Sequence, residues 1–431
     1  TFFLQTFGCQ MNVNDSERMR SLLMGAGLVE VSDPALARVV IVNSCAVRSK
    51  PQEKVLSWVG RLPVDTRVVV TGCSAQIERD TLRRKQKRIR AVLGTHQYAR
   101  IGEVVASLLA EEGVPAQVGF TREWQEIVPS AEARESRITA YLTIMEGCDN
   151  FCTYCVVPFT RSREKFRPVD QILAEAREIH AQGFQELVLL GQNVNHWEGP
   201  QGMGFPELLA RVAEEAPVPW IRFVTSYPGY HDERLIQVVA EHPRVARHIH
   251  FPAQSGSTRI LRAMGRRYTR TDYLSIIRAW RRAIPGMEFS SDFIVGFPGE
   301  TDHDHALTLS LLEQVRYTSV FSFVYSPRPH TRAAALPDTR PLAEKKAQLQ
   351  ALQALQARIQ LEDGQSLVGR EVRVLVTGPH PKRPEESLGR LENLRVVNLD
   401  RSVPAGSWVA ARVVRVSPHA VAATVVSTSR G

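Results

Sequence analysis

The chain has 431 residues, of which 43% are apolar, and carries a formal net charge of +9. This length predicts roughly two to four domains, and the apolar fraction is ordinary for a chain that buries a sizeable core. No uncharged apolar run is long enough to span a membrane, and residues 1–7 lack the charge and length of a signal peptide, so we expect a cytoplasmic protein with no membrane contact. The excess positive charge favours a polyanionic partner, although many basic proteins bind no nucleic acid.

Residues 1–112 are predicted to form a small, open α/β domain. Apolar, β-rich runs alternate with helix-like segments, as is typical of buried parallel strands; they are residues 2–7, 39–42, 68–70 and 91–93. Cys9, Cys45 and Cys73 each follow one of the first three runs. Because ligands gather at the carboxyl ends of strands in open α/β sheets, these cysteines are candidates to converge and hold a metal cluster. Taken singly, each is better explained as a buried structural cysteine.

Two further segments complete the first third of the chain. Six of the eight residues from 83 to 90 are basic, and this run is either a solvated face or a contact for phosphate groups. Residues 113–137 combine glycine, proline and scattered charges, and we expect them to be a linker that its neighbours order.

Cys148, Cys152 and Cys155 have the spacing CxxxCxxC. A four-iron cluster normally takes one thiolate per iron, so three cysteines leave one iron open to another ligand. A structural zinc site would need a fourth ligand, and the nearest downstream candidate, His180, lies in a predicted helix away from this loop. A disulfide would leave the third thiol unpaired and presumes an oxidising compartment. The spacing therefore favours an iron–sulfur cluster.

Residues 138–364 are predicted to form a partial (β/α)6 barrel. Strand and helix patterns alternate, and the strand candidates are residues 142–145, 186–190, 221–225, 248–251, 291–295 and 319–324. Residues 170–182 are a typical intervening helix, which Gly183 ends. Barrels of this kind carry chemistry on the loops at the carboxyl ends of their strands. We expect His248 and His250 to be hydrogen-bonded barrel histidines, because no third metal ligand is evident.

The remaining chain is predicted to form one helix and a small β domain. Leucines recur at helical spacing over residues 340–363, which predicts an amphipathic helix that packs on the barrel and stops at Gly364. Residues 365–431 switch to a valine-rich pattern of period two, which predicts a small antiparallel β-barrel. Ten Arg and Lys against five Asp and Glu over residues 366–431 leave a net charge of +5. Small basic barrels often bind oligonucleotides, and a stabilising β cap is the alternative.

The CxxxCxxC loop, with Tyr154 before its last cysteine and a strand-like segment before it, resembles the signature of the radical S-adenosylmethionine (radical SAM) superfamily. This resemblance implies that the open iron binds the amino and carboxylate groups of S-adenosylmethionine. One electron from the cluster then breaks the sulfonium C–S bond and yields a 5′-deoxyadenosyl radical. The implied cofactor contacts are Tyr154 of the cysteine loop, Gln192 and Asn193 near the methionyl amine, Gln254 near the ribose, and Ile294, Val295 and Gly296 near the adenine.

Residues 7–17, 43–48 and 71–76 resemble the three cysteine motifs of the methylthiotransferase amino-terminal domain, and residues 365–431 resemble the TRAM module, an RNA-binding appendage. The order of the parts covers essentially the whole chain and resembles the radical SAM methylthiotransferase family. The resemblance implies two [4Fe-4S] clusters and S-adenosylmethionine as cofactors. One cluster would be held by Cys148, Cys152 and Cys155, and a second, which handles the sulfur, by Cys9, Cys45 and Cys73.

Residues 7–12, 254–257, 268–270 and 325–329 are most similar to family members that act on tRNA. They imply insertion of a methylthio group at C2 of N(6)-isopentenyladenosine at position 37, beside the anticodon. The implied partners are the tRNA anticodon stem-loop, an external electron donor and a sulfur source, for a monomer or weak oligomer. The alternatives are family members that act on threonylcarbamoyladenosine in tRNA or on a ribosomal protein and, from a different class, a non-catalytic iron–sulfur RNA-binding protein.

Overall fold

A parallel four-stranded sheet forms the amino-terminal part of the chain. The computed structural model describes residues 1–46, 49–114 and 116–429. The strands pair in chain order, and they are β1 (Phe2–Phe7), β2 (Val39–Ser44), β3 (Arg67–Thr71) and β4 (Ile89–Leu93). Helices α1 (Gln10–Gly25) and α5 (Ile101–Leu109) pack on one face, and α2 (Ser49–Gly60) and α4 (Asp80–Lys85) on the other. The predicted open α/β domain is confirmed, with its three cysteines at the carboxyl ends of β1, β2 and β3.

The basic run and the linker follow this sheet. Arg84, Lys85, Lys87 and Arg90 are exposed. The side chain of Arg83 donates to the carbonyl oxygen of Val114 in the linker, and that of Arg88 to the carbonyl oxygen of Pro63 in the same domain. The described residues from 113 to 137 contain no helix or strand. They are nevertheless tied down by neighbours, because Gln117 pairs with Leu93 at the edge of the sheet. Val47 and Arg48 of the second cysteine motif and Pro115 of the linker lie outside the described residues.

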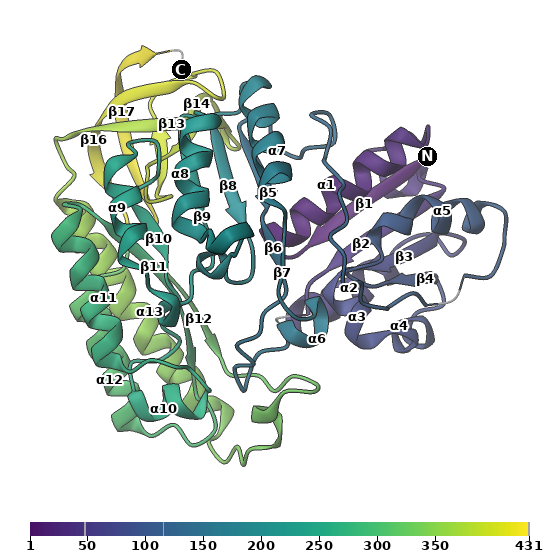
Figure 1. Cartoon of the computed structure of the whole chain (residues 1–431), viewed down its shortest axis with the longest axis horizontal. Coiled ribbons are helices and arrows are strands. Elements are labelled where there is room, and N and C mark those ends of the chain that lie inside the picture. The colour runs from purple at the N-terminus through teal and green to yellow at the C-terminus, as the bar shows by residue number, and fades with distance from the viewer. Residues whose placement is uncertain (47–48, 115, 430–431) are drawn as a thin grey trace.

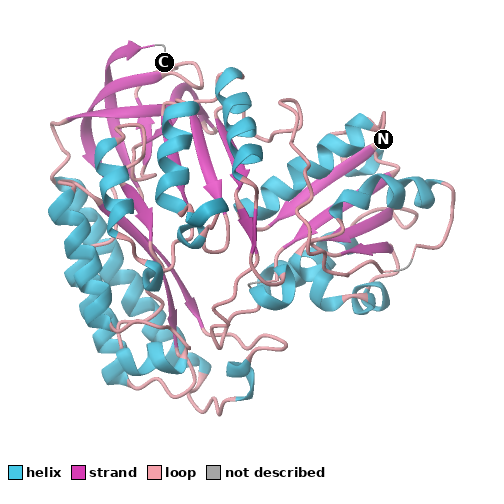
Figure 2. Ribbon diagram, in the orientation of Figure 1, coloured by secondary structure: helices cyan, strands magenta, loops and turns pink. Residues whose placement is uncertain are grey.

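Six parallel strands form the central partial barrel. The first three are β5 (Thr139–Thr143), β8 (Glu186–Leu190) and β9 (Trp220–Phe223), and the second three are β10 (His248–His250), β11 (Glu288–Val295) and β12 (Ser319–Val324). A parallel bridge between Ile221 and Val245 joins the two halves. Figure 2 shows helices along the outer side of these strands. They include α7 (Val169–Ala181), α8 (Phe205–Glu215), α9 (Glu233–Glu241), α11 (Arg270–Ala283) and α12 (Asp302–Val315).

The long helix α13 (Leu342–Gln365) connects the barrel to the last domain. It packs beside β12, where the side chain of Gln360 donates to the carbonyl oxygen of Thr318 at 2.7 Å. The prediction that Gly364 stops this helix is wrong, because the helix continues to Gln365. A Cβ atom on Gly364 would lie 2.3 Å from Val416 and 2.6 Å from Arg395, so this glycine instead permits close packing of the helix on the last domain.

The carboxyl-terminal domain is a closed five-stranded barrel. Its strands are β13 (Glu371–His380), β14 (Arg383–Arg390), β15 (Val396–Leu399), β16 (Trp408–Val416) and β17 (Ala420–Ser429). All pairs are antiparallel except β15 with β17, which is parallel. The predicted small β-barrel is therefore confirmed, and the antiparallel pattern holds for every pair but one. None of the helices in the described residues is both long enough and apolar enough to cross a membrane.

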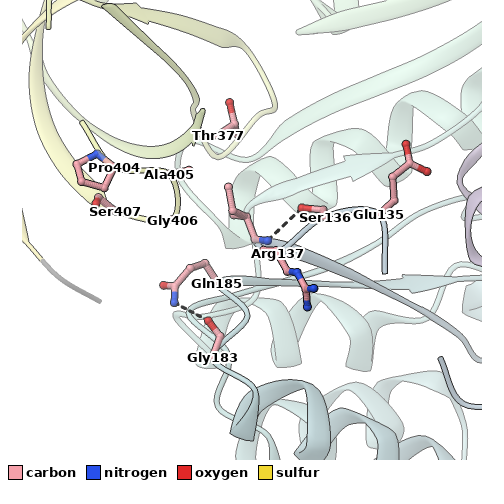
Figure 3. A pocket seen from close by; sticks show the side chains of 11 residues that line it. Glu135, Ser136, Arg137, Gly183, Gln185, Thr377, Pro404, Ala405, Gly406 and Ser407 are labelled. Carbon is pink, nitrogen blue, oxygen red and sulfur yellow. Dashed lines mark hydrogen bonds between the residues drawn. The ribbon is translucent and has the colours of Figure 1, made fainter. Parts of the chain in front are cut away.

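The carboxyl-terminal barrel docks on the amino ends of the central strands, away from the cysteine loop (Figure 1). Trp408 packs edge-on against Trp220 at 4.5 Å between ring centroids, and its indole N–H donates to Gln185 at 2.8 Å. Beside this contact lies a pocket of about 720 Å³ between the domains, lined by residues of the loops around Ser136 and Gly406 (Figure 3). Glu186, at the first position of β8, is buried and pairs with both Arg222 and Arg390.

We expect Glu186→Leu to destabilise the protein by about 3–5 kcal/mol, because it leaves two cations at the domain interface without their carboxylate. Glu313→Ala removes a carboxylate from an exposed ion pair with Arg358, and such pairs contribute only about 0–1 kcal/mol. Chemical denaturation of the two variants measures the difference. Equal losses of unfolding free energy in the two variants would contradict the larger contribution to stability that we assign to the buried network.

Candidate functional site

The loop that carries Cys148, Cys152 and Cys155 begins at a short hairpin of β6 (Met145–Glu146) and β7 (Lys165–Phe166). Gly147 has a φ of +83°, and a Cβ atom there would lie 2.0 Å from the carbonyl oxygen of Arg163, so the turn requires glycine. The amide oxygen of Gln192 accepts a hydrogen bond from the Gly147 N–H at 2.6 Å. The contact of Gln192 with the methionyl amine stays a prediction, whereas its contact with the start of the cysteine loop is direct.

The three thiols of this loop lie close enough to influence one another. Burial raises the pKa of Cys148 to about 11, and the neighbouring Cys152 adds to the rise. Burial followed by Cys152 raises the pKa of Cys155 to about 12, with Cys148 also contributing. The amide of Asn150 donates to the sulfur of Cys148 at 3.5 Å. A metal that binds here must therefore displace protons from the thiols, as metal sites with thiolate ligands ordinarily do.

Arg266 is the main site residue that the sequence analysis missed. Its side chain is buried and lies 3.7 Å from the sulfur of Cys152, with a second hydrogen bond to the carbonyl oxygen of Pro252. The guanidinium group stacks 4.3 Å from the Tyr227 ring centroid and 5.0 Å from that of Tyr268. In the described part of the chain it has no carboxylate within ion-pair distance. The environment fits an anionic cluster on Cys152, because that cluster would supply the missing counter-charge.

Arg266→Gln should lower the reduction potential of the cluster, because it removes a buried cation next to a cluster that becomes more negative on reduction. We expect a shift of at least about 59 mV, which is a tenfold change in a one-electron equilibrium. Redox titration followed by electron paramagnetic resonance measures it. Arg267→Gln is the matched control, since Arg267 is the adjacent residue and is exposed. An unchanged potential in Arg266→Gln would contradict this electrostatic role.

The place predicted for the methionyl amine contains an unpaired acceptor. Asn193 is buried, and its side-chain oxygen has no hydrogen-bond partner among the described residues. Its amide nitrogen donates to Glu164 at 3.3 Å, and Glu164 lies 2.7 Å from the ring of His196. His196 in turn stacks on Tyr230 at 4.0 Å between centroids. An unpaired buried acceptor beside the cysteine loop suits a bound ammonium group, which donates hydrogen bonds.

The other predicted cofactor contacts line the carboxyl ends of the strands. Gln254 has a φ of +71° and is buried, and its backbone pairs with Asp292 and Ile294. Val295 is fully buried and Ile294 half-buried. Tyr154, from the cysteine loop, packs against the same apolar cluster as Ile294. Their contacts with ribose and adenine stay predictions.

Gly296 lies against the side chain of Lys345, and its contact with the adenine stays a prediction. A Cβ atom there would lie 2.5 Å from the side chain of Lys345, which comes from α13. The Gly296 N–H donates to the carboxylate of Glu300 at 2.5 Å. Sequence patterns miss this arrangement, because Lys345 lies about fifty residues away along the chain.

The buried Glu300 should make stability depend on pH. Burial raises its pKa to about 7, so the folded protein binds this proton more tightly than the unfolded chain does. The stabilisation is present at low pH and is lost as pH rises from about 4.5 to 7. Glu300→Gln should remove this part of the pH dependence, which thermal unfolding of both proteins across that range measures. If the melting temperatures of the wild type and of Glu300→Gln change with pH in parallel, Glu300 is not the source of this pH dependence.

The second group of cysteines lies at the carboxyl edge of the amino-terminal sheet. Cys9 is exposed, whereas Cys45 and Cys73 are buried. The Cys45 N–H donates to the carbonyl oxygen of Phe7 at 2.9 Å, and the hydroxyl of Ser74 donates to the carbonyl oxygen of Cys45 at 2.8 Å. Burial raises the pKa of Cys73, against the effect of Arg161, and Cys9 raises it further. The sheet therefore brings the ends of three strands and their cysteines together, as the sequence predicted.

The two groups of cysteines face each other across the domain interface. Cys73 packs with Val156, the residue that follows Cys155. Helix α6 (Val157–Arg161) comes next, and the guanidinium of Arg161 forms a buried ion pair with Asp15 of α1 at 2.5 Å. The hydroxyl of Thr95 donates to the carbonyl oxygen of Thr160 at 2.5 Å. These contacts hold the cysteine loop of the barrel against the cysteine edge of the amino-terminal domain.

In the described residues no three His, Cys, Asp or Glu side chains surround a point that would suit a single metal ion. A four-iron cluster takes each thiolate on a different iron, so its cysteines do not share one point. For the histidines, the expectation of hydrogen bonds is right for His250, which contacts Ser290 and Asp292. It is wrong for His248, whose buried Nε2 atom has no partner in the described part of the chain.

Comparison with known families defines the class of the protein. Residues 142–312 match the radical SAM superfamily, residues 1–94 an uncharacterized protein family, UPF0004, and residues 365–426 the TRAM domain. Radical SAM methyltransferase TsrM from Kitasatospora setae aligns with a TM-score of 0.56 and 14% identity, over 77% of this chain and 75% of that chain. The cobalamin-dependent S-adenosylmethionine radical enzyme OxsB aligns with a TM-score of 0.53 and 13% identity. The alignment covers 82% of this chain and 56% of that chain. These likenesses show a shared fold. The match of residues 142–312 is what assigns the protein to the radical SAM superfamily.

Two curated relatives define the family. A tRNA-2-methylthio-N(6)-dimethylallyladenosine synthase from Geobacter sulfurreducens is 43% identical over 409 residues, which cover 92% of this chain and 90% of the relative. The protein of the same name from Myxococcus xanthus is 40% identical, over 99% of this chain and 94% of the relative. The chain therefore belongs to the family of tRNA-2-methylthio-N(6)-dimethylallyladenosine synthases, which are radical SAM methylthiotransferases.

Proposed function

We propose that the protein inserts a methylthio group at C2 of N(6)-isopentenyladenosine at position 37 of tRNA. The observation that carries this proposal is the placement of two cysteine trios on facing edges of two domains, joined through Cys73 and Val156. One trio without the other would support cleavage of S-adenosylmethionine but offers no second place for sulfur. The names of the relatives support the same substrate.

In this proposal each trio holds one [4Fe-4S] cluster. Cys148, Cys152 and Cys155 hold the cluster that, when bound, reduces S-adenosylmethionine, and Cys9, Cys45 and Cys73 hold the cluster that carries sulfur. The chain itself orients and shields these groups. Gln192 fixes the start of the loop, Asn193 offers an acceptor to the cofactor, and Arg266 balances negative charge at Cys152.

The proposed division of labour follows the domains. Residues 1–112 hold the cluster that carries sulfur, and residues 113–137 connect this domain to the central barrel. Residues 138–364 hold the cluster that cleaves S-adenosylmethionine, and residues 365–431 bind RNA. The anticodon stem-loop is the proposed substrate partner. An external electron donor reduces the enzyme, and an external source supplies the sulfur. The protein is a monomer or weak oligomer in the cytoplasm.

Mass analysis of tRNA nucleosides tests the substrate. A strain that lacks the gene should lose 2-methylthio-N(6)-isopentenyladenosine and regain it on complementation. An unchanged level of this nucleoside, with loss of the threonylcarbamoyl analogue or of a modified ribosomal protein, would assign the protein to one of the alternative substrates. A non-catalytic iron–sulfur RNA-binding protein is tested by anaerobic incubation with S-adenosylmethionine and a reductant, since such a protein forms no 5′-deoxyadenosine.

A further inference from the structure

One half of the barrel interior is filled by the amino-terminal domain. Met11, at the start of α1, packs against Val188 and Leu190 on the inner face of β8. Next to it, the hydroxyl of Thr143 donates to the side chain of Asn14 at 2.7 Å. At the amino ends of the strands, the network of Glu186 and the carboxyl-terminal barrel closes the interior. The interior beside β5, β8 and β9 is therefore occupied by the protein's own side chains.

The other half of the interior presents a different surface. His250 on β10, Asp292 on β11 and Phe321 on β12 face one another, with Asp292 and Phe321 opposite in register. The ring of His250 lies 6.0 Å from that of Phe321 and 3.4 Å from the carboxylate of Asp292, and its other nitrogen lies 3.0 Å from the Ser290 hydroxyl. The next side chain on β12, Ser322, points away, because it contacts Gln353 of α13.

This inner surface is exposed. Phe321 is 51% exposed, and the side chain of Asp292 is 32% exposed. An interior-facing phenylalanine with half of its surface uncovered is unusual beside a core in which Phe289 and Phe293 on the neighbouring strand are fully buried. The surface combines one apolar ring with a histidine–aspartate pair that its hydrogen bonds hold in place.

We propose that the side chains of Phe321, His250 and Asp292 receive the target base of the RNA. The ligand class is a single unstacked purine, whose ring packs on Phe321 and whose polar edge meets the Asp292–His250 pair. Bases taken out of an RNA loop are commonly held in this way, by one aromatic face and a few polar groups. This inference deepens the proposed function and rests on it, because it assigns residues to a substrate that the proposal names.

The position of this surface fits that role. Two residues beyond Asp292, the strand β11 reaches Ile294, which packs against the same apolar cluster as Tyr154 of the cysteine loop. Tyr325, directly after β12, belongs to the same cluster of side chains. A base on Phe321 would thus lie in the same barrel as the cysteine loop, below the ends of the strands that carry the cofactor contacts.

The test compares two RNA ligands on the full-length, anaerobically reconstituted protein. One is an anticodon stem-loop with N(6)-isopentenyladenosine at the target position, and the other has an abasic sugar there. Fluorescence anisotropy measures both affinities. Phe321→Ala should weaken binding of the first RNA about tenfold and leave the second unchanged. Leu361→Ala is the matched control, since Leu361 is an exposed apolar residue on the outer helix α13.

Two further variants keep the test independent of folding. Phe321→Leu retains apolar volume without the ring and should give a smaller loss, and Asp292→Asn should weaken only the base-bearing RNA. Equal weakening of both RNAs, or none, in variants with normal iron content would overturn the inference. Formation of the methylthio product by the wild type distinguishes failure of the proposed function from failure of the base-binding inference. A wild type that forms product while Phe321→Ala binds normally overturns this inference alone, and a wild type that forms none overturns both.

Discussion

Cys152→Ala should abolish the cleavage of S-adenosylmethionine. Cys152 is buried at the centre of the loop, with its sulfur next to Arg266, and in a cluster with three protein ligands each thiolate holds its own iron. Loss of a partner that only supports a metal ligand costs roughly 10–100-fold, so loss of a ligand should exceed about a hundredfold. Chromatography of 5′-deoxyadenosine after anaerobic incubation with dithionite measures the effect.

Thr153→Ala is the control for this loop. The Thr153 hydroxyl donates to the carbonyl oxygen of Ala263, and its backbone N–H contacts Met264 independently of the side chain. The variant should keep cleavage within a few-fold of the wild type. Cleavage that survives in Cys152→Ala at the level of Thr153→Ala would show that the radical chemistry does not depend on this trio.

Cys45→Ala should separate the two activities of the enzyme. We expect it to retain part of the cleavage of S-adenosylmethionine but to form no methylthio product. The physical reason is that Cys45 lies at the end of β2, in the other domain, and belongs to the second trio. Both activities are measured in one incubation, as 5′-deoxyadenosine and as the modified nucleoside.

Cys9→Ala is the companion variant, because Cys9 is exposed and its replacement leaves no cavity in a core. It should show the same division as Cys45→Ala. Equal loss of both activities in a Cys9→Ala protein with an unchanged melting temperature would contradict the division of labour between the clusters.

Much of this organisation could be predicted from the sequence. Apolar runs of strand length locate β1 to β4 and the six barrel strands. Cysteines that directly follow parallel strands meet at one edge of the sheet, and this placement does not depend on the conformation of the loops. The spacing of Cys148, Cys152 and Cys155 indicates a cluster because only a local loop is involved. In each of these cases the relevant contacts lie within one motif or follow from one sheet.

The residues that escaped prediction depend on contacts between distant segments. Arg266 comes from a loop more than a hundred residues after Cys152, and nothing in its own segment shows that it would be buried beside a thiol. Lys345 of α13 lies against Gly296, and Gly364 lies within a helix where the carboxyl-terminal barrel packs closely on it. Local patterns of turn residues do not report such packing, since tertiary contacts override them.

Iron and sulfide content of the anaerobically reconstituted chain tests the central claim most directly. With a four-iron cluster on each trio, the wild type should contain about eight irons and eight sulfides per chain, and Cys9→Ala or Cys152→Ala should each retain about four. A wild type that holds about four irons, all of which disappear in Cys152→Ala while Cys9→Ala keeps them, would contradict the account.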